Sequence, residues 1–239
     1  MSGHSKWKNI MHKKGKTDAQ RAKTFTKIGK EIAMCVKAGG PDPDTNSKLK
    51  DLIAKAKANN VPGDNIDRVI HKAASSDSEN YESITYEGYG PSGVAVIVET
   101  ATDNRNRTGS DLRHYFDKFG GNLGTTGCVS YMFETKGIIL IAAEGIDEDT
   151  IMEDALESGA DDILVEDDLF EIQTQPYTLH AVKEALEKAG YNIENAEEEK
   201  VPSNYITLTN EDDVIKMNRL LEMLEDNDDV QNVWHNWDC

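Results

Sequence analysis

The hydrophobic pattern of this 239-residue chain changes once, at a polar linker of residues 75–80. Before the linker, apolar residues such as Leu49, Leu52 and Ala56 recur every three or four positions, which is the period of an amphipathic helix. This pattern predicts three helices, at about 17–38, 47–59 and 64–74. After the linker, short β-rich runs alternate with single helices, so the sequence predicts an α+β protein whose first domain is all helical.

The predicted elements after the linker follow one repeated order. Residues 135–200 predict β-α-β-β-α-β, the order of a ferredoxin-like unit. The flanking segments predict β-α-β at 94–133 and β-α-β at 205–234, and together they would complete a second unit of that order. We therefore expect two ferredoxin-like α/β domains, one inserted between the central strands of the other. One continuous antiparallel sheet with helices on one face is the alternative.

These expectations divide the chain into three domains. They are a basic helical domain at 1–78, a discontinuous domain at 79–134 and 204–239, and an acidic inserted domain at 135–203. In the discontinuous domain the predicted strands are at 94–99, 128–133, 205–209 and 230–234.

Charge is also divided unevenly along the chain. The net charge is -18, yet residues 1–74 contain 16 Lys and Arg against 7 Asp and Glu. Residues 134–203 contain 20 acidic residues against 4 basic ones. Because regions of opposite sign attract different partners, we expect two surfaces. The basic one would bind a polyanion, whereas the acidic one would repel nucleic acid and meet a basic protein surface.

Four lysines of the first predicted helix lie along one side of it. At about 100° per residue, Lys27, Lys30 and Lys37 lie within about 40° of Lys23, and the apolar residues lie opposite. We call these four residues the lysine stripe. Solvated helix faces usually alternate Glu with Lys because like charges four residues apart repel, and only Glu31 lies near this stripe. The stripe therefore predicts contact with phosphates, and a solvated lysine face is the alternative.

A basic segment precedes this helix and contains no acidic residue before Asp18. Its candidate nucleic-acid contacts are Lys6, Trp7, Lys8, His12, Lys13, Lys14 and Lys16. Cationic side chains neutralise phosphates, and the Trp7 ring offers a face on which a base can stack. The alternative is a solubilising tail whose Trp7 packs on the helical domain.

Two arginines, Arg105 and Arg107, lie where a predicted strand gives way to a helix at about 107–119. Guanidinium groups beside a helix N-terminus suit a phosphate or a carboxylate. The alternative is an ordinary turn held by Asp103 and Asn104, with Thr108 or Asn106 capping the helix.

Patterns typical of enzymes and metal sites are missing from the sequence. Its six histidines form no HExxH motif, there is no GxSxG motif, and the acidic runs lack the spacing of a calcium loop. Cys35, Cys128 and Cys239 are too far apart for a zinc knuckle or a disulfide framework. We therefore expect no catalytic residue, no metal and no cofactor.

Apolar runs are short throughout the chain. The longest, at 137–143, has the length of a strand, whereas a membrane span needs about 20 residues. The N-terminus has no apolar stretch typical of a signal peptide. We therefore expect no membrane partner and a cytoplasmic location.

Several ordered motifs resemble those of the YebC family. They are GHSKW at 3–7, YEGYGPSGVA at 86–95, TDNRNRT at 102–108 and GGNLG at 120–124. The resemblance covers essentially the whole chain. It implies a cytoplasmic protein with a helical first domain and two α/β domains, the last inserted in the second, and no established enzymatic activity.

The resemblance also implies a function. Family members are described as DNA-binding transcriptional regulators, while others, including a mitochondrial translational activator of cytochrome oxidase, act on mRNA or at the ribosome. The resemblance thus implies a nucleic-acid-binding regulatory protein, acting on DNA in transcription, with a ribosome- or mRNA-associated translation factor as the alternative. It assigns nucleic-acid binding to the helical domain, here to Lys6, Lys8, His12, Lys13, Lys14, Lys23, Lys27 and Lys30. No helix shows a cluster of Arg, Asn and Gln for reading base edges, which favours the translation alternative.

Overall fold

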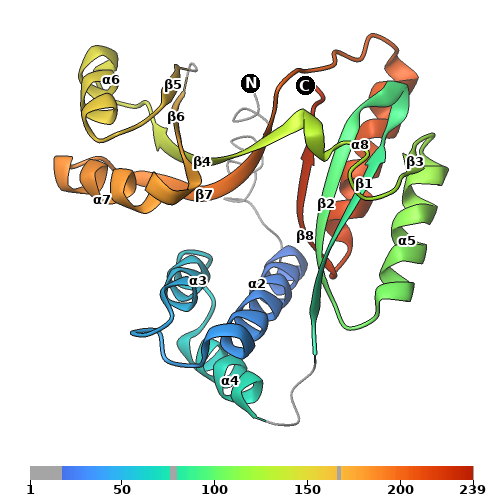
Figure 1. Ribbon diagram of the computed structural model, residues 1–239, viewed down its shortest axis with the longest axis horizontal. Coiled ribbons are helices and arrows are strands. Elements are labelled where there is room, and N and C mark those ends of the chain that lie inside the picture. The colour runs from blue at the N-terminus through green and yellow to red at the C-terminus, as the bar shows by residue number, and fades with distance from the viewer. Residues whose placement is uncertain (1–17, 76–79, 166–167, 239) are drawn as a thin grey trace. The chain divides into compact units, whose positions relative to one another are not determined.

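The computed structural model describes residues 18–75, 80–165 and 168–238 (Figure 1). These residues divide into two compact units. One unit contains 131–207 and 236–238, and the other contains the preceding residues together with 208–235. The first unit therefore interrupts the chain of the second. None of the described helices has the length and hydropathy needed to cross a membrane.

The larger unit begins with three helices, α2 (Asp18–Gly39), α3 (Ser47–Ala58) and α4 (Gly63–Ala74), which confirm the helical N-terminal region. Ile32, Leu49 and Ile66 bury one apolar face of each helix in a common core. The amide of Asn46 ties α2 to α3, because its Oδ1 accepts from the backbone N–H of Leu49 while its Nδ2 donates to carbonyls at the end of α2. Side-chain capping of this kind satisfies backbone donors that a helix leaves unpaired.

The same unit contains an antiparallel sheet in the order β3-β1-β2-β8. Its strands are β1 (Glu82–Tyr89), β2 (Ala95–Thr102), β3 (Asn122–Leu123) and β8 (Val230–His235). Two helices, α5 (Arg105–Lys118) and α8 (Glu211–Asp226), contact each other, and each also contacts a strand of the sheet (Figure 1). Every residue of β2 from Ala95 to Val98 is fully buried, as expected for a strand covered on both faces.

Four segments of this unit and its borders differ from the prediction. The strands β1 and β3 were missed. The segment 128–133 is mostly a loop with the 3-10 turn η2 (Ser130–Met132), and 205–209 forms only one isolated bridge. The loop has a physical cause. The buried carboxylate of Glu87 accepts from the backbone N–H groups of Gly127, Val129 and Ser130, so these donors do not pair with a strand. Burial alone would raise the pKa of Glu87, but these hydrogen bonds lower it below its usual range.

The interrupting unit has the predicted order β-α-β-β-α-β. Its elements are β4 (Phe133–Ala142), α6 (Glu148–Glu157), β5 (Asp162–Val165), β6 (Leu169–Thr174), α7 (Leu179–Ala189) and β7 (Ile193–Pro202). The strands lie in the order β5-β6-β4-β7 and all pairs are antiparallel, which is the ferredoxin-like arrangement. Alternate residues of β4, such as Ile139 and Ile141, pack against α6 and α7 on one face of this sheet.

Candidate nucleic-acid interface

Three lysines of the stripe contact the acidic turn, which we define as residues 225–229, the last two residues of α8 and the three residues before β8. The contacts join Lys23 Nζ to Asp226 Oδ1 at 2.8 Å, Lys27 Nζ to the Glu225 carbonyl oxygen at 2.7 Å, and Lys30 Nζ to Asp229 Oδ1 at 2.6 Å. Lys30 also donates to the carbonyl oxygen of Asp228 at 2.9 Å. The stripe therefore faces carboxylates and carbonyls of its own chain.

These contacts differ in burial. The side chains of Lys30 and Asp229 are 11% and 6% exposed, whereas those of Lys23 and Asp226 are 37% and 68% exposed. Lys27 is half-buried, and this burial lowers its pKa to about 8 although Glu225 and Asp228 act in the opposite direction. The stripe thus runs from an exposed pair at Lys23 to a buried pair at Lys30.

Asp229 collects hydrogen bonds from three elements. Besides the bond from Lys30 of α2, its Oδ2 accepts from Arg107 at 2.7 Å and from the Thr108 hydroxyl at 2.8 Å, both at the start of α5. It also accepts from the hydroxyl of Thr102, the last residue of β2, at 3.2 Å. Burial would raise the pKa of Asp229, but the hydrogen bonds from Arg107, Lys30 and Thr108 lower it to about 2. A charged Asp229 therefore holds the helices α2 and α5 together at the end of β2.

The turn before α5 is capped differently from the prediction. Asn104 is the N-cap, because its side chain accepts from the backbone N–H of Arg107 at 3.1 Å, while Asn106 and Thr108 lie inside the helix. The guanidinium of Arg107 binds Asp103 as well as Asp229, and these bonds raise its pKa. Arg105 is exposed to solvent.

These contacts correct one premise of the sequence argument. We expected no acidic residue to neutralise the lysine stripe, yet Asp226 and Asp229 lie directly against it. The sequence could not show this pairing because Lys30 and Asp229 are 199 positions apart. Lys23, Lys27, Lys30 and Arg107 are thus held by the protein's own oxygen atoms. The remaining stripe residue, Lys37, is exposed and donates to Asn80 Oδ1 at 3.4 Å.

The candidates of the basic segment lie outside the residues that the structure describes. They are Lys6, Trp7, Lys8, His12, Lys13, Lys14 and Lys16.

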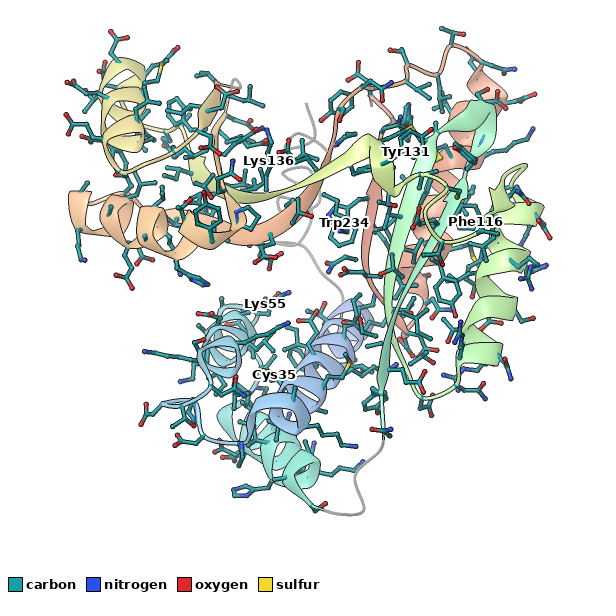
Figure 2. All side chains as sticks on the ribbon, in the orientation of Figure 1. Cys35, Lys55, Phe116, Tyr131, Lys136 and Trp234 are labelled. Carbon is teal, nitrogen blue, oxygen red and sulfur yellow. The ribbon has the colours of Figure 1, made fainter. Side chains whose placement is uncertain are left out.

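The helix α3 presents cations that the sequence argument did not select. Lys48, Lys50 and Lys57 are exposed, and Lys55, labelled in Figure 2, lies 3.4 Å from Glu31. Lys50 and Lys57 are seven positions apart, so they project from the same side of the helix. The sequence could have indicated this basic helix, because it contains two Lys-x-Lys pairs and Asp51 is its sole acidic residue.

A cavity of about 300 Å³ lies between α2 and α4. Apolar residues of both helices form most of its wall, and Phe25 and Tyr81 add aromatic rings. Its lining includes Lys30, Arg68 and Lys72 but no carboxylate. The Lys30 amine lies 5.5 Å from the centre of the Tyr81 ring, where a cation is attracted to the π face. The helical region therefore combines an apolar hollow with cationic groups.

The described residues contain no group of three His, Cys, Asp or Glu side chains arranged to hold a metal ion. Cys35 is buried and its thiol lies 3.5 Å from Asn46 Oδ1, and burial raises its pKa. Burial likewise raises the pKa of the Cys128 thiol. Neither cysteine is activated for nucleophilic chemistry, which requires a lowered pKa.

Comparison with known proteins places the chain in one family. Residues 5–76 match the family described as "TACO1/YebC protein N-terminal domain", and residues 81–237 match "TACO1/YebC second and third domain". A protein of Acetivibrio thermocellus named "Probable transcriptional regulatory protein" is 61% identical over 239 residues, with 99% of each chain covered. A relative of the same name from Caldicellulosiruptor bescii is 58% identical over 240 residues, covering 100% of this chain and 98% of the relative.

A solved structure agrees with these sequence matches. The crystal structure of a conserved hypothetical protein from Aquifex aeolicus superposes with a TM-score of 0.85 at 45% identity, covering 94% of this chain and 93% of that one. With both family matches together spanning nearly the whole sequence, the chain belongs to the TACO1/YebC family.

Proposed function

We propose that this protein is a nucleic-acid-binding regulator whose helical region contacts the phosphate backbone through α3. The observation that carries the proposal is the contrast between two lysine-rich helices. The amines of Lys23, Lys27 and Lys30 on α2 are held by the acidic turn, whereas Lys50 and Lys57 project into solvent from one side of α3. Exposed cations aligned on one helix face suit a polyanion. The basic segment before α2 supplies further cations.

The names of the relatives support a role in transcription, so we propose DNA as the first candidate target. The composition of α3 supports a second candidate, a translation factor that binds mRNA or the ribosome. The exposed side chains of α3 are Ser, Lys, Asp and Ala, and none is the Arg, Asn or Gln that typically reads base edges. Contacts of this kind position a protein on a backbone without selecting a sequence. The proposed role is binding in the cytoplasm and not catalysis.

Charge reversal on α3 tests the proposal in the full chain. We expect Lys50→Glu with Lys57→Glu to weaken binding to a short duplex DNA or a single-stranded RNA at least tenfold, measured by fluorescence anisotropy. The slope of the logarithm of affinity against the logarithm of salt concentration should fall by about 2, one unit for each lost phosphate contact. A matched control reverses Lys183 and Lys188 on α7, which carries the same charge change in the acidic unit.

The outcomes of this experiment separate the candidates. Equal losses in the α3 variant and the α7 control would assign the effect to net charge and overturn the α3 surface. A loss of affinity confined to the α3 variant supports α3 as the binding surface. Parallel titrations then choose the target, because tighter binding of RNA than of DNA at equal salt favours the translation factor, and the reverse favours the transcriptional regulator.

A further inference from the structure

The outer face of α6 exposes two large apolar side chains in the acidic unit. Met152 and Leu156 are 36% and 56% exposed, while Ile151 and Ala155, about 100° away around the helix, are fully buried. Residues four apart on a helix lie one above the other, so Met152 and Leu156 form a continuous apolar ridge. The core of the unit does not use this ridge, since the buried side chains of α6 already fill its contact with the sheet.

Carboxylates border the ridge on both sides. At about 100° per residue, Glu148 lies on one side of Met152 and Leu156, and Asp149 and Glu153 lie on the other. No Lys or Arg occurs in the sequence between Lys136 and Lys183. The pairs at positions 149 and 153, and at 153 and 157, place like charges four residues apart, which repel each other in the isolated helix. A cationic partner would relieve this repulsion.

We propose that this ridge, Met152 and Leu156 with its flanking carboxylates, docks a cationic amphipathic helix of a partner protein. Apolar side chains at helical spacing match the anchors by which amphipathic helices are recognised. Methionine adapts to irregular partner surfaces, and the surrounding charge selects a basic partner and speeds its approach. The same charge repels nucleic acid and the acidic unit of a second copy of this chain. This interaction is independent of nucleic-acid binding by the helical region.

The test measures binding of a synthetic peptide to the full chain. The peptide is an amphipathic helix of leucine, alanine and lysine, and its control is a peptide of the same composition in scrambled order. We expect the amphipathic peptide to bind at least tenfold more tightly than the scrambled one. Replacing Met152→Ser together with Leu156→Ser should remove that advantage. Both positions are exposed, so these substitutions leave the core unchanged.

A matched control comes from α8. Ile215 is 60% exposed there, and its neighbours on the helix include the acidic Glu211 and Asp212 as well as the basic Lys216 and Arg219, so its surroundings are of mixed charge. We expect Ile215→Ser to change peptide affinity less than twofold. Replacing Glu148→Gln together with Glu153→Gln removes one carboxylate on each side of the ridge. This variant should bind the peptide more slowly, with a weaker dependence of the association rate on salt, while the apolar ridge stays in place.

Three results would overturn the proposal. The first is equal binding of the amphipathic and scrambled peptides, which would show attraction by charge alone. The second is unchanged affinity in the Met152→Ser, Leu156→Ser variant. The third is self-association of the wild-type chain in sedimentation that this variant abolishes, which would assign the ridge to a second copy.

Discussion

Replacing Asp229→Asn tests whether the buried carboxylate joins the helical region to the sheet. The Asp229 side chain is 6% exposed and accepts hydrogen bonds from Lys30, Arg107 and Thr108. Asparagine keeps the shape but loses the charge, leaving the amine of Lys30, whose side chain is 11% exposed, without this counter-ion. Removing one partner of a buried ion pair costs about 3–5 kcal/mol, and we expect a loss of that size in the free energy of unfolding at neutral pH.

The same carboxylate makes the effect depend on pH. Its pKa is about 2 in the folded chain, against about 3.9 when unfolded. A lowered pKa means that the unfolded chain binds more protons in this range, so stability is gained as pH rises. A shift of about two units is worth roughly 2–3 kcal/mol, present above about pH 5 and lost as pH falls through 2. The difference between wild type and Asp229→Asn should therefore shrink on acidification.

Urea unfolding of both proteins across this pH range measures the effect, and Asp226→Asn is the matched control. Asp226 belongs to the same acidic turn and pairs with Lys23, but its side chain is 68% exposed. Exposed pairs contribute about 0–1 kcal/mol, so we expect a loss below 1 kcal/mol for this variant. Equal losses in the two variants, or a difference between wild type and Asp229→Asn that does not change with pH, would refute the reasoning.

Two further predictions concern the glycine-rich and loop segments of the same unit. Glu87→Gln should lower the free energy of unfolding by about 1–3 kcal/mol and speed amide hydrogen exchange in the loop at 127–130. The reason is that a glutamine NH₂ cannot accept from the backbone N–H groups that the carboxylate holds. Glu134→Gln, at an exposed position, is the control and should change neither quantity. Gly121→Ala should lower the free energy of unfolding by more than about 1–3 kcal/mol, because the added Cβ would lie within 3.1 Å of two backbone atoms. Gly63 has open space around it, so Gly63→Ala is the control and should leave the stability unchanged or raise it. Thermal unfolding of both variants measures the difference.

Local sequence was sufficient for the elements whose cause is local. The helices of the N-terminal region begin and end within one or two residues of the prediction, because a 3.6-residue period and breakers such as Pro62 act over a few positions. The β-α-β-β-α-β order of the acidic unit could also be predicted from the sequence, since all its strands and helices lie in one continuous segment of the chain. The ordered motifs of the sequence likewise indicated the family by themselves.

Tertiary structure decided what depends on distant partners. The segment 128–133 has a strand-like sequence, but the carboxylate of Glu87, some 40 positions earlier, takes its backbone donors. The lysine stripe of α2 seemed to lack acidic neighbours, but the fold brings Asp226 and Asp229 against it. Periodicity shows which side of a helix a residue occupies, whereas its partner across the chain is set by packing. For that reason the sequence alone determined where cations are concentrated, and only the fold decided which of them remain exposed to bind a polyanion.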